Sequence, residues 1–227
     1  MFVQVAGAHD LQEVKSVVSI GITHLALPLG PGVREQDVSL EKAGRMFRFL
    51  PAFVSGVVIT YLSEAEEISG LCSRVGCKWV QLHGDILGSE VKRLRLIRSD
   101  LGIIKSLVVG KKGERALLEE CTAFAPYCDM FITDTFDPQT GACGATGRMH
   151  DWEISRAVVR DSPRPVILAG GLGPDNVYQA VMHVRPAGVD AHTGLEDSRG
   201  RKDPQMVRRF VREARRAEQD LMQLKSG

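Results

Sequence analysis

Short apolar runs rich in β-branched residues alternate with longer helical stretches along the whole chain. Runs of this kind, with few polar positions, are typical of parallel strands that helices cover. The expected strands are residues 2–5, 22–27, 53–59, 78–82, 102–108, 129–133, 165–169 and 187–190. The expected helices lie near residues 10–19, 39–49, 63–75, 86–98, 113–125, 151–160, 174–183 and 203–223.

Eight strand–helix repeats in 227 residues predict one α/β domain over residues 1–227, a (β/α)8 TIM barrel of the phosphate-binding type. A doubly wound open sheet is the structural alternative, but the first strand lacks the G-x-G-x-x-G that would support dinucleotide binding. Two helix starts carry signals. Ser39 precedes one helix, and Pro174 is expected in the first turn of another.

The loops after the seventh and eighth strands are expected to bind phosphate. Gly170 and Gly171 come after one strand, and Thr193 and Gly194 come after the other. Adjacent glycines let a ligand approach the backbone N–H groups, and phosphate sites built from these two loops recur in barrels. The alternative is that these glycines only form tight turns.

Composition narrows the class of partner. Hydrophobic residues make up 44% of the chain, charged residues make up 25%, and the formal net charge is +1. These values suit a soluble enzyme and provide no basic stripe for nucleic acid. Because there is no signal peptide and no long apolar run, we expect a cytoplasmic protein without a membrane partner, either monomer or homodimer. The five cysteines have no zinc-ligand spacing, so no metal is expected.

Several motifs together resemble the phosphoribosylanthranilate isomerase family, the barrel of the tryptophan pathway. Residues 80–84 read VQLHG as the fourth-strand motif of that family does, and residues 144–152 (GATGRMHDW) are similar to its G-G-T-G-x-x-F-D-W loop. Residues 167–172, 184–190 and 202–204 resemble the seventh unit, the eighth unit and the opening of the last helix. The resemblance extends from Met1 to about Val211.

The resemblance implies an Amadori rearrangement of a phosphoribosylamine. A general acid protonates the ring oxygen, and a general base removes the C2 proton, so no cofactor is expected. In the family these groups are an Asp at the end of strand six and a Cys at the end of strand one. Asp134 stands at the position of the acid. At the position of the base, the family's K-I-C-G is replaced by residues 4–7, QVAG, so Ala6 stands in place of the cysteine and Gln4 in place of the lysine.

A second departure concerns the aromatic acid. The family has an Arg after strand two that meets the anthranilate carboxylate, and that position aligns with Gln36, while Arg34 lies two residues away. We therefore consider Arg34 and Gln36 as substrate-binding candidates, together with His83 at the end of strand four. His192 is the candidate for a relocated base, because an imidazole titrates near neutral pH. Cys143, in the strand-six loop, is a further substrate-side candidate with a thiol that could act if its pKa were lowered.

Three interpretations are compatible with these residues. The first is an enzyme similar to phosphoribosylanthranilate isomerase that performs an aldose–ketose isomerisation on a related small phosphorylated sugar, with an altered base and aglycone pocket. The second is ordinary N-(5'-phosphoribosyl)anthranilate isomerase activity with a relocated base. The third is a non-catalytic barrel that still binds a phosphorylated ligand. Loss of one proton-transfer group costs on the order of 10²–10⁴ in rate, so Ala6 by itself does not exclude catalysis.

Overall fold

Strands and helices alternate through the computed structural model of the chain, which describes residues 1–33, 38–137, 142–143 and 152–226. The strands are β1 (Phe2–Ala6), β2 (His24–Pro28), β3 (Ser55–Thr60), β4 (Trp79–Leu82), β5 (Gly102–Val109), β6 (Met130–Asp137), β7 (Ala142–Cys143), β8 (Val166–Leu168) and β9 (Gly188–Ala191). The helices are α1 (Leu11–Val18), α2 (Leu40–Phe49), α3 (Ala65–Val75), α4 (Gly88–Ile97), α5 (Glu114–Phe124), α6 (Trp152–Asp161), α7 (Val177–Val184) and α8 (Pro204–Ser226), with a short 3₁₀ turn η1 (Thr193–Leu195).

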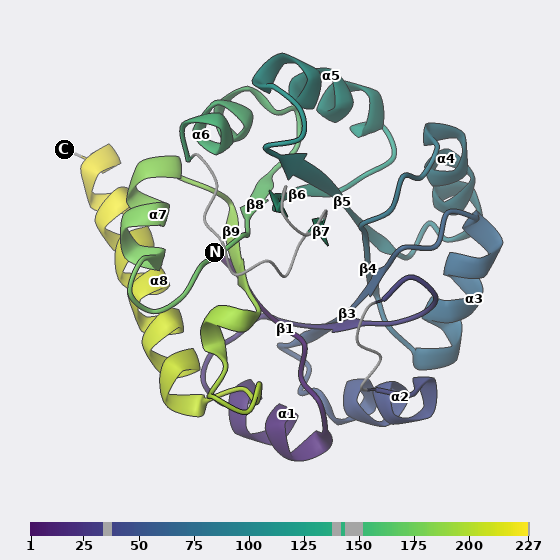
Figure 1. The fold of residues 1–227 in the computed structure, drawn as a ribbon, viewed down its shortest axis with the longest axis horizontal. Coiled ribbons are helices and arrows are strands. Elements are labelled where there is room, and N and C mark those ends of the chain that lie inside the picture. Colours follow the sequence, from purple (N-terminus) through teal and green to yellow (C-terminus); the bar gives the residue numbers. More distant parts are fainter. Residues whose placement is uncertain (34–37, 138–141, 144–151, 227) are drawn as a thin grey trace.

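Eight parallel strands close into a barrel, and the expected (β/α)8 architecture is confirmed. β1 pairs with β2 on one side and with β9 on the other, and β5 pairs with β6 to complete the ring. The helices form an outer layer around these strands (Figure 1). None of the helices in the described part of the chain is long and apolar enough to cross a membrane.

The two faces of the strands belong to different cores, as the two-residue period of a strand requires. Positions such as Val3, Val5, Leu25 and Leu27 pack outward against the helices. The alternate positions fill the inside of the barrel with a smaller apolar cluster. Its members are Ala6, Ala26, Val57, Ile59, Ile104, Ile132, Ile167 and Ala169. Three of these inner residues, Ala6, Ala26 and Ala169, carry only a methyl side chain.

An aromatic group closes the opposite end of the barrel. Phe2 and His24 stack with their ring centroids 3.7 Å apart, and the edge of Trp79 meets both rings. Gly188 begins β9 beside this group, where a Cβ atom would lie 2.5 Å from Cβ of Phe2. The starts of β1, β2, β4 and β9 therefore pack against one another at this end of the barrel.

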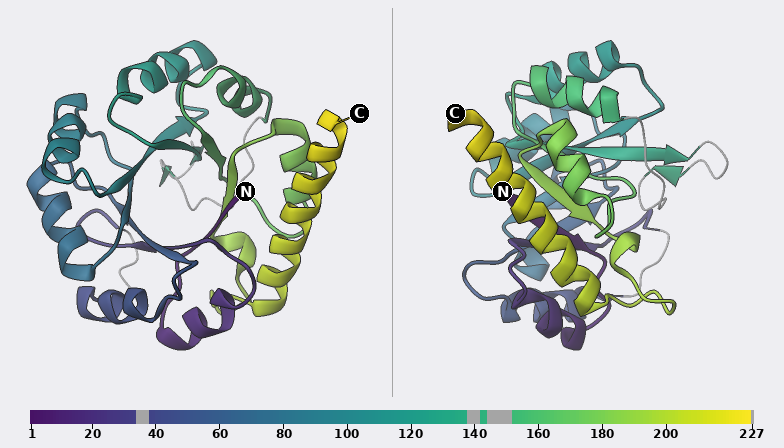
Figure 2. Two further views of the ribbon diagram at one scale, coloured as in Figure 1. Left: turned by 180° about the vertical axis from the view of Figure 1, so that it is seen from behind. Right: turned by 90° about the vertical axis from the view of Figure 1, so that its left-hand side faces the viewer.

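Three local features differ from the sequence expectations. The helix expected from residue 174 begins at Val177, because residues 174–176 form a turn and the Asn176 side chain bonds back to Gly171 and Gly173. The two-residue strand β7 pairs antiparallel with β6, and β6 extends beyond the other strands (Figure 2). The η1 turn was also not expected. By contrast, Ser39 caps α2 as predicted, with its hydroxyl accepting from Lys42 N–H.

Candidate active site

Asp134 lies near the carboxyl end of β6 and faces the inside of the barrel mouth. Its carboxyl is buried, and its Oδ1 accepts the backbone N–H of Thr135 at 2.9 Å. The other oxygen, Oδ2, lies 3.0 Å from Nδ1 of His83 without the alignment of a hydrogen bond. Among the described residues, neither of these two atoms has a hydrogen-bond partner. A buried polar atom rarely stays unpaired, so this pair marks a place where a substrate atom can bind.

A chain of hydrogen bonds leads from this pair across the interior of the barrel. Gln81 Nε2 lies 2.5 Å from His83 Nε2, and Gln81 Oε1 accepts from Gln4 Nε2 at 2.9 Å. The same Gln4 amide donates to Asp190 Oδ1 at 3.0 Å. Because Gln4 turns its NH₂ group toward two oxygens, Gln81 presents its own NH₂ group to the imidazole. His83 Nε2 is thereby an acceptor, and Nδ1 carries the proton that faces Asp134.

Asp190, on β9, is the buried end of this chain. Burial raises the pKa of its carboxyl to about 6, while the hydrogen bond from Gln4 opposes that rise and the charge of Asp134 adds to it. The lysine that the family carries at the position of Gln4 would supply a positive charge here, and the amide supplies none. The hydrogen bond to Asp190 Oδ1 therefore comes from a neutral amide.

Ala6 occupies the inward position near the carboxyl end of β1, where the family has its cysteine. It is 2% exposed and belongs to the apolar cluster inside the barrel. A methyl group cannot exchange a proton. The base implied by the family motif is therefore absent at this position in the fold as well as in the sequence.

His192, the candidate for a relocated base, lies against the turn after β1. A Cβ atom on Gly7 would fall 2.0 Å from His192 Nε2, and Gly7 has φ +79°, so the ring rests directly on a glycine backbone. Burial lowers the pKa of His192 to about 3, with further lowering from Lys202 and His9. Its Nε2 lies 3.4 Å from Oε1 of Glu196. The imidazole is neutral at physiological pH and has little affinity for a proton.

The two glycine loops predicted to bind phosphate lie directly against each other. A Cβ atom on Gly194 would lie 2.0 Å from the Leu172 carbonyl oxygen, so only glycine allows this approach. Gly170 and Gly171 both have positive φ, at +98° and +63°. Thr193 is exposed beside them. The four predicted residues are thus brought together at the carboxyl ends of β8 and β9.

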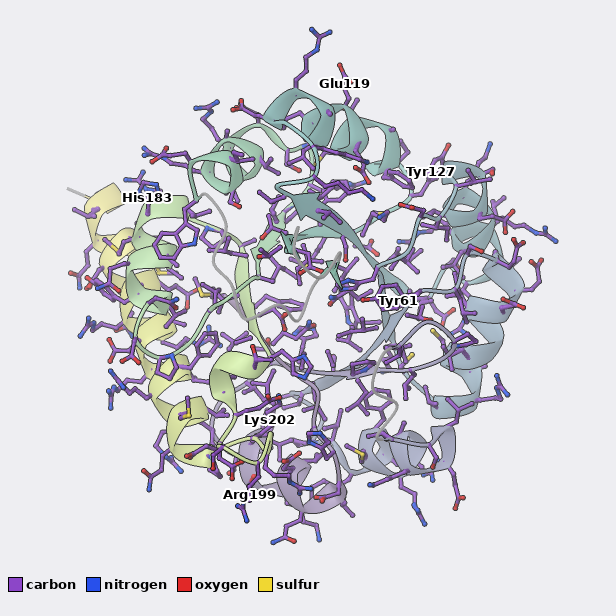
Figure 3. The ribbon with its side chains drawn as sticks, viewed as in Figure 1. Tyr61, Glu119, Tyr127, His183, Arg199 and Lys202 are labelled. Atoms are coloured by element: carbon purple, nitrogen blue, oxygen red, sulfur yellow. The ribbon has the colours of Figure 1, made fainter. Side chains whose placement is uncertain are left out.

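Lys202 supports the second of these loops from behind, a role that sequence reasoning missed. Its side chain is fully buried, and its Nζ donates to the His192 carbonyl at 3.2 Å and pairs with Glu196 (Figure 3). Burial lowers the pKa of this lysine, while Glu196 opposes the shift. Its backbone N–H donates to Glu13 of α1 at 2.9 Å. The only signal in the sequence was its place in the motif that opens the last helix.

Some of the remaining substrate-binding candidates lie within the described residues and others do not. Tyr61 lies in the loop after β3 (Figure 3), and its ring centroid is 5.6 Å from that of His83. Arg34 and Gln36 lie outside the described residues, as does the side chain of Cys143, whose backbone belongs to β7. In the described ranges, no group of three or more His, Cys, Asp or Glu side chains could hold a metal ion.

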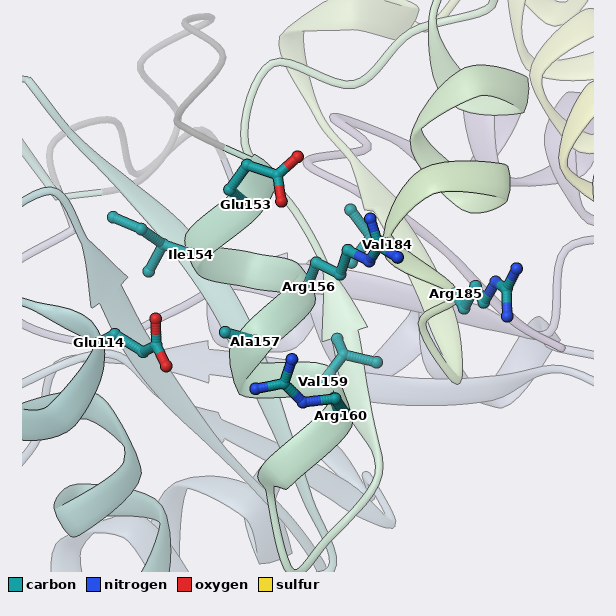
Figure 4. A pocket seen from close by; sticks show the side chains of 9 residues that line it. All are labelled: Glu114, Glu153, Ile154, Arg156, Ala157, Val159, Arg160, Val184 and Arg185. Carbon is teal, nitrogen blue, oxygen red and sulfur yellow. The ribbon is translucent and has the colours of Figure 1, made fainter.

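A pocket of about 690 Å³ lies away from this site, on the outside of the barrel (Figure 4). It is formed by α6 together with the start of α5 and the end of α7, and charged side chains including Arg156, Arg160 and Arg185 line it. Its lining includes none of the residues that converge at the barrel mouth. We therefore locate the candidate site at the mouth, where the unpaired polar atoms lie.

Comparisons with known proteins agree on one family. Residues 3–213 match the family model of N-(5'phosphoribosyl)anthranilate (PRA) isomerase. N-(5'-phosphoribosyl)anthranilate isomerase 2 of Methanosarcina mazei is 38% identical over 216 residues, which cover 95% of this chain and 94% of that protein.

Solved structures agree with the family match. A phosphoribosyl anthranilate isomerase in complex with reduced 1-(o-carboxyphenylamino)-1-deoxyribulose 5-phosphate has a TM-score of 0.77 and 26% identity, covering 95% of this chain and 98% of that one. Monomers generated from the dimeric isomerase of Thermotoga maritima have a TM-score of 0.78 and 25% identity, with the same coverage.

Proposed function

The chain belongs to the N-(5'-phosphoribosyl)anthranilate isomerase family, and on that premise we propose that it isomerises N-(5'-phosphoribosyl)anthranilate in tryptophan biosynthesis. The product would be 1-(o-carboxyphenylamino)-1-deoxyribulose 5-phosphate, whose reduced form is bound in a related structure. The reaction is an intramolecular aldose–ketose isomerisation. It needs only acid and base, so we propose neither a metal nor an organic cofactor.

The observation that carries this proposal is the position of Asp134. Its Oδ2 is buried and has no hydrogen-bond partner among the described residues, and the site at its β6 position is the one the family uses for its general acid. An acid must reach the ring oxygen of the substrate directly. An unpaired carboxyl oxygen at the barrel mouth meets that requirement.

The paired glycine loops support a phosphorylated substrate. Gly194 packs against the Leu172 carbonyl of the other loop, and Gly171 has a φ of +63°, so both loops depend on glycine at these positions. We propose that these loops, with Thr193, bind the phosphate. The sugar would then extend toward Asp134, so that the distance between loop and acid sets the length of substrate.

The first interpretation from the sequence, a related sugar with an altered aglycone, has less support than the ordinary substrate. The family match covers residues 3–213, and the relatives that cover most of the chain are isomerases of phosphoribosylanthranilate. The departure at Gln36 lies outside the described residues and carries no structural argument. We therefore favour the ordinary reaction with a changed base.

The proposed reaction can be tested by steady-state assay and by complementation of a tryptophan auxotroph that lacks the isomerase. We expect the wild-type chain to convert the substrate and restore growth. Asp134→Asn should lower kcat by on the order of 10²–10⁴ and abolish growth, because the amide cannot donate a proton to the ring oxygen. Asp161→Asn, at an exposed position on α6, is the matched control and should behave as wild type. Conversion by Asp134→Asn at the wild-type rate would contradict the role of Asp134.

Ala6 gives a specific reason to keep a second candidate, a barrel that binds the phosphorylated sugar without converting it. Calorimetry with the reduced product analogue distinguishes the two. Binding that phosphate competes for, without any turnover, supports the binding protein. Binding together with turnover supports the isomerase.

A further inference from the structure

The reaction requires two proton transfers, yet the residue at the position of the family's base is an alanine. Assigning a different base to this chain rests on the proposed function, since only that reaction needs one. Ala6 is surrounded inside the barrel by apolar residues such as Ala26 and Ile59, so the proton of C2 must be taken by another group. The described titratable side chains that face this interior are His83, Asp134, Asp190 and His192.

Three of these four are poorly placed for the task. His192 lies on Gly7 with its Nε2 directed toward Glu196, and its pKa near 3 means that it takes up a proton reluctantly. Asp190 pairs in register with Gln4, one inward position deeper than Ala6, and its Oδ1 is bound by the Gln4 amide. His83 has its Nε2 bound by Gln81. Among the described residues, Asp134 Oδ2 makes no aligned hydrogen bond, and it contacts His83 Nδ1 at 3.0 Å.

We propose that Asp134 carries out both proton transfers, and that His83 is the positioning residue that holds its Oδ2. The carboxylic acid first gives its proton to the ring oxygen of the sugar, and the C1–O bond breaks to leave an iminium ion between C1 and the anthranilate nitrogen. The carboxylate that remains then takes the proton of C2. The C2–H electron pair forms the C1–C2 double bond of an enolamine, and the nitrogen recovers its lone pair.

In this sequence of steps, a single side chain gives one proton and takes one back. The proton lost by Asp134 in the first step is replaced by the proton of C2 in the second, so the acid is regenerated. The enolamine then tautomerises to the ketone. The ring oxygen and C2 are both bonded to C1, so the two sites of proton transfer are neighbours. A single carboxyl at the mouth therefore serves both without moving far.

The hydrogen-bond chain supplies the positioning. Gln4 and Gln81 orient their amides so that His83 Nε2 accepts and Nδ1 carries a proton toward Asp134. That N–H stabilises the carboxylate formed in the first step without neutralising it, which keeps the carboxylate available as the base. Among the described residues, His83, which directly follows β4, contacts Asp134, and the charge of Asp134 also acts on Asp190 of β9.

The pH dependence of kcat distinguishes a mechanism with one acid–base residue from a mechanism with a separate acid and base. An enzyme with a distinct acid and base gives a bell-shaped profile. If Asp134 alone gives and takes the proton, kcat falls only as pH rises, and the profile has no acid-side limb. We expect this single limb both in wild type and in His83→Asn, with circular dichroism confirming the fold at each pH. An acid-side limb that persists both in His83→Asn and in Asp190→Asn would show a second base and overturn the proposal.

Variants identify any rival base directly. His192→Gln and Cys143→Ser should each lower kcat by less than about tenfold. A loss on the order of 10²-fold in either one, with KM unchanged, would assign the second transfer to that residue. In that case turnover of phosphoribosylanthranilate by wild type still stands, so only the role of Asp134 as base fails. Absence of turnover in wild type would instead remove the proposed function.

The positioning role of His83 can be tested with two substitutions at this residue. Asn places an amide N–H near the position of Nδ1, so we expect His83→Asn to keep kcat within about tenfold of wild type, whereas His83→Ala loses about 10²-fold because Oδ2 is no longer held. KM should change little in both variants. Equal losses in His83→Asn and His83→Ala would contradict the positioning role.

Discussion

Two histidines of this protein are held in the uncharged form by the fold. Burial lowers the pKa of His24 to about 4, and it lowers that of His192 to about 3 together with the charges of Lys202 and His9. His24 stacks on Phe2 in the closed end of the barrel, and His192 lies in the loop after β9. His24 and His192 therefore lie at opposite ends of the same barrel.

We expect these histidines to make the protein less stable in acid. The unfolded chain takes up protons near pH 6.5, whereas folded His24 resists them until about pH 4. Stability is therefore full above about pH 6.5 and is lost as pH falls toward 4, because the unfolded state binds more protons. Urea unfolding at a series of pH values measures this decline. In His24→Phe, which keeps an aromatic ring beside Phe2, the decline should be shallower. An unchanged slope would mean that His24 does not contribute.

For single residues of the candidate site, the sequence predicted some and missed others. Asp134 and His83 could be singled out because each stands in a motif at the end of an expected strand. The hydrogen bonds that join Gln4 to Gln81 and Asp190 could not be predicted, because they connect residues 77 and 186 positions apart. The low pKa of His192 results from burial, which spacing along the chain does not reveal.

Among the elements, the loops after β8 and β9 depend on each other. Gly194 meets the Leu172 carbonyl so closely that any side chain would force the loops apart. The Asn176 side chain fixes the first loop through Gly171 and Gly173. The predicted phosphate site is therefore a property of both loops together.

Gly194→Ala tests this dependence. We expect the variant to raise KM and the Kd for inorganic phosphate by about tenfold or more, because backbone overlap of this kind costs roughly 1–3 kcal/mol. kcat should fall less. Gly113→Ala is the control, since a Cβ atom at Gly113 meets nothing within 4 Å. Phosphate affinity equal to wild type in Gly194→Ala would place the phosphate elsewhere.

Periodic patterns predicted the kind and order of the elements well, and their ends less well. The barrel strands lie where the apolar runs are, because both faces of such strands are buried. The start of α7 was placed at Pro174 from its helix-start signal, but the Asn176 side chain closes a turn first. β7 and η1 are only two and three residues long, so no hydrophobic periodicity could predict them.

For the whole molecule, closure of the barrel depends on the last helix. α8 packs against α7, α1 and β1, and the N-terminal ammonium pairs with Glu218 on this helix. Arg215 donates to the Met1 carbonyl at 3.0 Å. The first strand is thereby tied to the end of the chain. Phe210 is fully buried on the same helix.

Phe210→Ala should therefore destabilise the entire barrel. We expect a loss of about 3–5 kcal/mol in the free energy of unfolding, the usual cost of removing a buried phenyl ring. Leu224→Ala, on the same helix but 67% exposed, should change it by less than about 0.5 kcal/mol. Urea denaturation followed by circular dichroism measures both. Equal effects would mean that α8 is not part of the cooperative core.

The pairing of β1 with β9 has a consequence for synthesis on the ribosome. β1 emerges well before β9, and the edge that will meet β9 has no partner until about 180 more residues have been added. At roughly 5–20 residues per second this takes on the order of 10–40 s. An unpaired strand edge is a template for association with other chains. Between the synthesis of β1 and that of β9, the nascent protein thus carries an unpaired strand edge, and this edge is where a chaperone has most to protect.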